Sequence, residues 1–434
     1  MNRPLGAFAF VPLFSLIFSV STVRAGTDHI YDVPSGVRVV ADSLSDGENP
    51  ARVVKTGPGG LKLTSPNSFS GGLILKEGTV INGAEWSFGT GPVTLGNAQE
   101  SGDVVLDVGN FSNYTTIPNP IILSEGAAKI IIRQAGGFNN FLGGTVTGKN
   151  SLSVSTDGGA NLSFTELIDF TGDLINVSGG PGIIQIKGGV GPAVRSIVNA
   201  SSSSPIKIVD KPLVVGPAGK KLVNEAGGKG VVLLFTSTGL GDLTVQNNSS
   251  LEGGINITGG GLLHEGDLVN SGKGTGSVTV RAVITGKVKD IIQDSATSPL
   301  VLSGQNAQTG DTIVRQGRLI VANAKAIPSQ RKITLQGGIL EFREVHEQVF
   351  VLDLAAASTL ELAEAARVNF VLVPASRWQG PLKITGGFTS GASIRFGSSV
   401  NALNSRQLAQ ISVEGHREPK LNSQGYLVAT PTAR

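Results

Sequence analysis

The chain of 434 residues has no cysteine, one methionine and only four histidines. Without cysteine it can form neither a disulfide nor a thiolate metal site, so backbone hydrogen bonds and packing must hold the fold together. Aromatic residues make up 5% and charged residues 15% of the chain, which does not suit a globular helical enzyme. The apolar share of 40% with a net charge of +3 argues equally against a disordered chain.

Glycine, by contrast, is abundant. The chain has 60 glycines, about twice the usual share of roughly 7%, and they separate short runs of β-forming residues. The segment between Gly57 and Val80 contains two such runs, Leu61–Leu63 and Leu73–Leu75, with an Asn/Ser/Gly turn between them. Short alternating runs bounded by turn residues predict many short strands.

This pattern recurs with constant spacing. A leucine stands ten residues before one glycine, and a second glycine follows seven residues later. Because a repeat of this size cannot bury its own apolar face, it predicts a stacked solenoid. The repeat residues are Leu61, Leu63, Gly71 and Gly78, then Leu243, Val245, Gly253 and Gly260, then Leu300, Leu302, Gly310 and Gly317; a fourth, stretched copy has Leu152, Val154, Gly172 and Gly179.

If the copies are equivalent coils, the two apolar residues of each first run point inward, because residues two apart share one face of a strand. The residues between them, Lys62, Thr244 and Val301, then point outward. The first glycine of each copy is expected at a turn with positive φ. We also expect turn asparagines to stack and to hydrogen-bond along the axis; these are Asn67, Asn248 and Asn306.

The copies resemble the autotransporter-associated β-strand repeat. The first copy matches it at Gly57, Gly59, Leu61, Leu63, Asn67, Phe69, Gly71, Gly72 and Gly78, and the last at Leu300, Leu302, Gly304, Asn306, Gly310, Gly317 and Leu319. Gln308 departs from the repeat, since an aromatic residue is usual there. The resemblance implies a right-handed parallel β-helix, an all-β fold, on an exported surface protein.

The chain divides into four parts. These are a signal peptide (1–25), an N-terminal cap or first coil (26–52), a β-helix (53–342) with repeats near 57–80, 148–186, 239–263 and 296–320, and last coils with a C-terminal capping module (343–434). Residues 355–366 have helical propensity, but their spacing favours strands. Asn404 or Ser405 is expected to cap a short helix. The serines 201–204 predict a protruding loop.

The N-terminus predicts export. Arg3 precedes an apolar run, Leu5–Val20, and small residues flank Arg24 before a cut at Gly26. Removal of Arg3 and Arg24 leaves a nearly neutral chain, so we expect no nucleic-acid partner. We expect no transmembrane segment after signal removal. Few alternating runs of the length of a membrane strand follow Leu319, so we expect no C-terminal barrel in this chain.

Candidate chemistry is sparse. His264, Glu265 and Asp267 could hold a divalent cation, although an exposed turn is the favoured interpretation. In a second polar group, Glu341, Glu344, His346 and Glu347, alternation places Glu344 and His346 on one face. A polysaccharide lyase or hydrolase needs clustered carboxylates, and we expect no run of acids from adjacent coils and no cofactor.

The sequence therefore predicts an exported, non-enzymatic β-helix surface or matrix protein with a structural or adhesive role. Its expected partner is an extracellular glycan or another surface protein. The alternative is an extracellular carbohydrate-active β-helix enzyme, a polysaccharide lyase or hydrolase.

Overall fold

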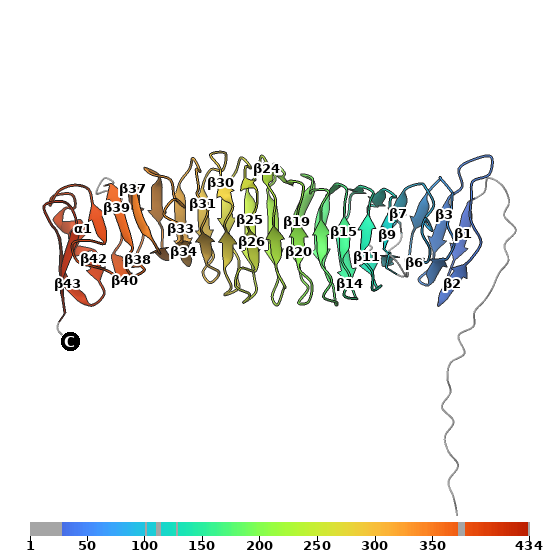
Figure 1. Cartoon of the computed structure of the whole chain (residues 1–434), viewed down its shortest axis with the longest axis horizontal. Coiled ribbons are helices and arrows are strands. Elements are labelled where there is room, and N and C mark those ends of the chain that lie inside the picture. Colours follow the sequence, from blue (N-terminus) through green and yellow to red (C-terminus); the bar gives the residue numbers. More distant parts are fainter. Residues whose placement is uncertain (1–27, 100–101, 110–113, 127–128, 372–377, 433–434) are drawn as a thin grey trace, which may run out of the picture.

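The computed structural model describes residues 28–99, 102–109, 114–126, 129–371 and 378–432. These residues form a long rod with the first strands at one end and the last strands at the other (Figure 1). The rod is a β-solenoid of about 15 turns with almost no helix, as predicted. The signal-peptide prediction lies outside the described residues.

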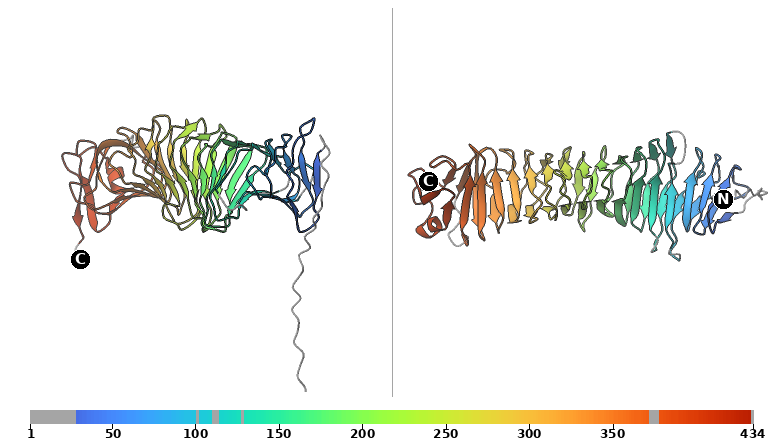
Figure 2. Two further views of the ribbon diagram at one scale, coloured as in Figure 1. Left: turned by 45° about the vertical axis from the view of Figure 1, so that its right-hand side comes forward. Right: turned by 90° about the horizontal axis from the view of Figure 1, so that it is seen from below.

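The turns of the chain contribute short strands to three faces that run along the rod, which we call faces A, B and C, and some turns omit one of these faces. Strands of successive turns pair in parallel on each face (Figure 2). Face A consists of β1 (His29–Asp32), β3 (Val53–Thr56), β5 (Leu73–Leu75), β7 (Val93–Leu95), β10 (Ile121–Leu123), β13 (Val146–Gly148) and β16 (Ile168–Phe170), continued through a bridge at Val190 by β21 (Leu213–Val215), β24 (Ser237–Gly239), β27 (Gly261–Leu262) and β30 (Val283–Ile284).

Face B is a continuous series of parallel pairs from β2 to β41. It consists of β2 (Val37–Val40), β4 (Gly60–Leu63), β6 (Gly78–Asn82), β8 (Val104–Asp107), β11 (Ile130–Gln134), β14 (Leu152–Thr156), β17 (Gly172–Asn176), β19 (Val194–Asn199), β22 (Lys220–Asn224), β25 (Leu243–Asn247), β28 (Leu268–Asn270), β31 (Ile291–Asp294), β33 (Thr312–Gln316), β35 (Lys332–Leu335), β37 (Val345–Leu354), β39 (Arg367–Val371) and β41 (Ile394–Phe396).

Face C starts later along the rod. It consists of β9 (Thr115–Ile117), β12 (Asn140–Leu142), β15 (Leu162–Phe164), β18 (Ile184–Ile186), β20 (Ile206–Ile208), β23 (Val231–Leu233), β26 (Ile255–Ile257), β29 (Val278–Val280), β32 (Leu300–Leu302), β34 (Arg318–Val321), β36 (Ile339–Phe342), β38 (Ser358–Leu362), β40 (Leu382–Gly386) and β42 (Ile411–Val413). The strand β38 confirms the strand prediction within residues 355–366.

The end of the rod is covered by the short helix α1 (Ser405–Ala409) and by an antiparallel hairpin of β43 (His416–Leu421) and β44 (Leu427–Pro431). Asn404 is the N-cap, and Gln407 completes a capping box with it. The predicted cap of the helix is therefore confirmed. Such a module blunts the strand edges that an open solenoid end would expose.

The core is formed by alternate residues of each strand, which point into the rod. The six apolar residues of the three repeat copies are fully buried, and Lys62, Thr244 and Val301 between them are only partly buried. Neighbouring coils stack these side chains in register, so that Leu61 pairs with Val80 and Leu300 with Leu319. Each of these two copies therefore closes one complete coil in nineteen residues.

The second copy has the same spacing but a different geometry. Leu243 pairs with Leu268, twenty-five residues later, and Leu262 lies on face A rather than above Leu243. In the stretched copy, Leu152 pairs with Leu174. The first and last copies omit one strand per coil, whereas the other two keep all three faces. Equal spacing thus does not make the copies equivalent coils.

The first glycines also differ from the expectation. Only Gly253 has positive φ, at 63°. Gly71 is required because an added Cβ would lie 2.6 Å from the carbonyl oxygen of Ala51, and at Gly310 it would lie 2.6 Å from the carbonyl oxygen of Lys289. Close approach to the coil below, rather than a left-handed turn, selects glycine at those two positions.

The serines at 201–204 are not a protruding loop. Ser201 and Ser204 are buried, and the Ser201 hydroxyl donates to the Ser178 carbonyl at 2.6 Å. They form a corner between β19 and β20, in which the Ser201 hydroxyl accepts from the Ser204 amide and the Ser204 hydroxyl donates to the Gly182 carbonyl.

Candidate functional site

The side chains of the first predicted metal group, His264, Glu265 and Asp267, do not point toward a common site. The His264 side chain is fully buried; its Nδ1 lies 2.9 Å from Ser237 Oγ and its Nε2 3.3 Å from the Asp267 carbonyl oxygen. Glu265 is exposed and pairs with Lys287 at 3.3 Å. The exposed-turn interpretation is therefore wrong for His264, whose burial lowers its pKa and favours the neutral ring.

The second polar group also has both buried and exposed members. His346 is buried, with its ring 4.7 Å from that of Phe342, while exposed Glu344 accepts a hydrogen bond from the Ala324 amide at 3.0 Å. The prediction that they share a face is wrong because Glu344 lies in a bend before β37, which begins at Val345, so strand alternation does not extend to it. The Glu347 side chain lies outside the described ones.

Glu341 belongs to an ion-pair cluster on the outer side of face C. Arg318 contacts Glu341 at 2.5 Å and Glu361 at 3.1 Å, and Arg343 contacts Glu341 at 2.5 Å. Because two guanidinium groups neutralise two carboxylates, the cluster offers no free acid–base pair. It joins three neighbouring coils instead.

Sequence reasoning missed a row of four aspartates at the corner between faces A and B. The Asp242 carboxylate accepts from the Asp267 amide at 2.8 Å, Asp267 from Asp290 at 3.1 Å, and Asp290 from Asp311 at 2.7 Å. The expectation of no acids from adjacent coils is therefore wrong. The row is hidden in the sequence because its steps are 25, 23 and 21 residues.

The carboxylates of this acidic row (Asp242, Asp267, Asp290 and Asp311) are close enough to influence each other's protonation. Partial burial raises the pKa of Asp267, and the charges of Asp242 and Asp290 contribute. Lys332 pairs with Asp311 at 2.7 Å. In the part of the chain that the structure describes, no three acidic or histidine side chains are placed to hold a metal ion.

The turn asparagines separate into two kinds. Asn67 accepts from the Leu44 amide at 2.7 Å and donates to the Ser87 carbonyl at 2.5 Å. Asn306 does the same between Ile284, at 3.0 Å, and Ala326, at 2.8 Å. Both span the coil side that lacks a strand. Asn248 is partly exposed and contacts Glu225 and Lys273 instead.

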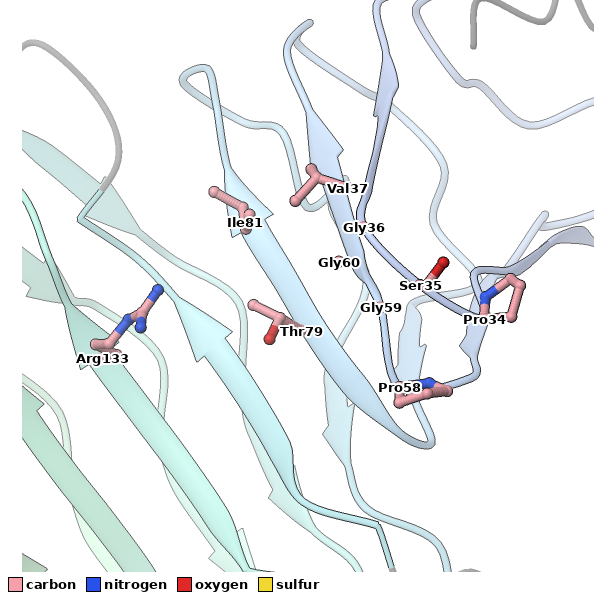
Figure 3. A pocket seen from close by; sticks show the side chains of 10 residues that line it. All are labelled: Pro34, Ser35, Gly36, Val37, Pro58, Gly59, Gly60, Thr79, Ile81 and Arg133. Carbon is pink, nitrogen blue, oxygen red and sulfur yellow. The ribbon is translucent and has the colours of Figure 1, made fainter. Parts of the chain in front are cut away.

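A shallow depression of about 410 Å³ lies on the outer side of face B near the N-terminal end (Figure 3). Its floor is formed by Gly59, Gly60 and Thr79, and Arg133 stands at its edge. The Arg133 guanidinium already contacts Asp107 at 2.7 Å. Arg133 is the one ionisable residue of the lining, so the depression has no acid–base pair for catalysis.

The comparisons with known proteins agree with this geometry. A family model, the passenger-associated-transport-repeat, matches residues 53–81 and 300–321, the two segments that close a coil in nineteen residues. No curated protein and no solved structure matches the chain. No helix among the described residues is long and apolar enough to cross a membrane. The two repeat matches and the β-solenoid together support an autotransporter passenger-type repeat protein.

Proposed function

We propose that this passenger-type repeat protein is an exported, non-enzymatic β-helix that acts at the bacterial surface or in its matrix, with a structural or adhesive role. The observation that carries the proposal is the use of its polar groups. The carboxylates of Asp242, Asp267 and Asp290 accept backbone amides of the next coil. Each of these carboxylates thus stacks one coil on the next.

The rod shape supports a structural role as a spacer. About 15 turns at roughly 4.8 Å per turn make a rod roughly 70 Å long. Parallel ladders on three faces resist bending, since any bend must stretch hydrogen bonds on one side. Such a rod holds its outer faces at a defined distance from whatever anchors it.

The alternative, a carbohydrate-active enzyme, is favoured by one observation. The acidic row presents carboxylates of adjacent coils, and the pKa of Asp267 is raised, as a general acid requires. The test is reducing-sugar release from a panel of polysaccharides by the wild type and by Asp267→Asn and Asp290→Asn, which keep the accepting oxygen. Our proposal expects no release above the buffer level. Release that both variants abolish would establish the enzyme.

Export is tested in the native host. An antibody raised against the folded rod should label intact cells or the extracellular matrix, and the exported chain should begin at Gly26. Protein confined to the cytoplasm, or an exported chain that begins at Met1, would contradict the proposal. Adhesion is then measured as retention of rod-coated beads on the host's natural surfaces, with beads coated in heat-unfolded chain as the control.

A further inference from the structure

Aromatic side chains are concentrated in the core, and their few exposed members lie together. Among the described residues, the exposed aromatic side chains are Trp86, Tyr114 and Phe138, at 50%, 64% and 40% of full exposure. The remaining described phenylalanine, tyrosine and tryptophan side chains are buried or partly buried. Exposed rings cost solubility, so a group of three on an otherwise polar corner indicates an interaction site.

The three rings come from three successive coils near the start of face C. The Tyr114 and Phe138 rings meet edge to face at 5.9 Å. Trp86 lines a small crevice together with Thr115 and Thr116 of β9, and β9 pairs with β12, which begins two residues after Phe138. The three residues thus belong to three successive coils, and coils follow one another at roughly 4.8 Å along the rod. We call Trp86, Tyr114 and Phe138 the aromatic row.

Neutral polar groups surround the aromatic row. Thr116 is exposed beside it and pairs with Phe141 on the outer side of face C. The Asn139 side-chain oxygen accepts from the Asn161 amide at 2.8 Å, which leaves its amide hydrogens as donors. Lys187 lies over the Phe141 ring at 5.9 Å, and Glu85 is exposed next to Trp86, so the charges nearby balance.

We propose that the aromatic row binds a neutral linear oligosaccharide of pyranose sugars. A pyranose ring has an apolar C–H face that packs on an aromatic ring, while its hydroxyls pair with amides and hydroxyls at the edge. The length of one sugar unit is close to the distance between coils, so successive sugars can meet successive rings. This site rests on the adhesive role proposed above and assigns that role a ligand class.

The chemistry favours a glycan over a second protein. A protein interface generally needs a larger apolar core than three rings. An anionic glycan is disfavoured because Lys187 is the one cation among the groups named here and Glu85 opposes it. A row one ring wide, with hydroxyl and amide groups at its edges, matches a single extended sugar chain.

The test uses tryptophan fluorescence of the full chain. The protein has two tryptophans, and Trp378 is 6% exposed, so a ligand on the surface changes the emission of Trp86. The probes are cellohexaose, chitohexaose and maltohexaose, titrated separately. The variant Tyr114→Ala/Phe138→Ala keeps the reporter and removes two rings. The matched control is Leu240→Ala/Val283→Ala, which removes two exposed apolar side chains elsewhere.

We expect at least one probe to shift the Trp86 emission saturably. The ring variant should weaken that binding at least tenfold, and the control should stay within twofold of the wild type. Circular dichroism and melting temperature should be unchanged in both variants, because the altered residues are exposed.

Three outcomes would overturn the site. They are no saturable shift with any probe, unchanged affinity in the ring variant, and self-association in sedimentation velocity that the ring variant abolishes. Each would leave antibody labelling of intact cells unaffected, so failure of this site is distinguishable from failure of the proposed export.

Discussion

Asn306 repeats the hydrogen bonding of Asn67 in a coil much further along the rod. Each side chain accepts from an amide of the preceding coil and donates to a carbonyl of the following one. Each does so in a coil that lacks one strand. The asparagine therefore replaces the missing ladder, which explains its place in the repeat.

Asn67→Ala and Asn306→Ala should each destabilise the protein by about 2–4 kcal/mol, because each leaves a buried amide and a buried carbonyl unpaired. Asn248→Ala is the matched control and should cost under about 1 kcal/mol, since water can replace its exposed contacts. The measurement is chemical denaturation followed by circular dichroism. Equal costs for all three variants would contradict the bridging role.

Gln308 occupies the position that Phe69 holds in the first repeat. It is fully buried, and neither atom of its amide has a partner among the described residues. Gln308→Leu should therefore stabilise the protein by about 1–2 kcal/mol. The reverse change, Phe69→Gln, should cost about 3–5 kcal/mol. A melting temperature that falls in Gln308→Leu would show that the amide is satisfied, for instance by a buried water.

Lys220 makes the free energy of unfolding depend on pH. Its buried Nζ donates to the Gly191 and Val194 carbonyls, and burial lowers its pKa from 10.5 to about 8. Between these two values the unfolded chain binds more protons than the folded one, so stability rises with pH. Lys55 has the same shift and contributes in the same direction.

In unfolding experiments between pH 7 and 10, Lys220→Met should flatten this rise. The full contribution of one such lysine is on the order of 3 kcal/mol. The comparison of slopes is independent of any uniform loss of stability in the variant. A slope identical to that of the wild type would mean that Lys220 titrates normally.

Much of this fold could be predicted from the sequence, because alternation and glycine turns are local. Leu61, Leu243 and Leu300 are buried as expected. What could not be predicted is which coil lies above which, since that depends on how many residues each turn uses. The acidic row gives no signal in the sequence for this reason. The repeat spacing likewise aligns Asn248 with Asn67, although its neighbour Asn247 is the buried one.

The candidate site also depends on features that are not local in the sequence. His264, Glu265 and Asp267 are close in sequence, but they lie in the connection between β27 and β28, which turns His264 into the core and Glu265 toward solvent. The aromatic row carries no local signal at all, because its members are separated by loops of unequal length and meet only when the coils stack.

The central claim is that the two matched segments close a coil in nineteen residues, whereas the look-alike segment at Leu243 takes twenty-five. Paired cysteines test it directly, because the chain has no cysteine of its own and a disulfide requires Cα atoms about 4.4–6.8 Å apart. Lys62→Cys/Ile81→Cys and Thr244→Cys/Val269→Cys join register partners and should oxidise fully to the intramolecular disulfide. Thr244→Cys/Leu263→Cys, which a nineteen-residue coil would bring together, should remain reduced; its oxidation in place of the Thr244–Val269 pair would contradict the account.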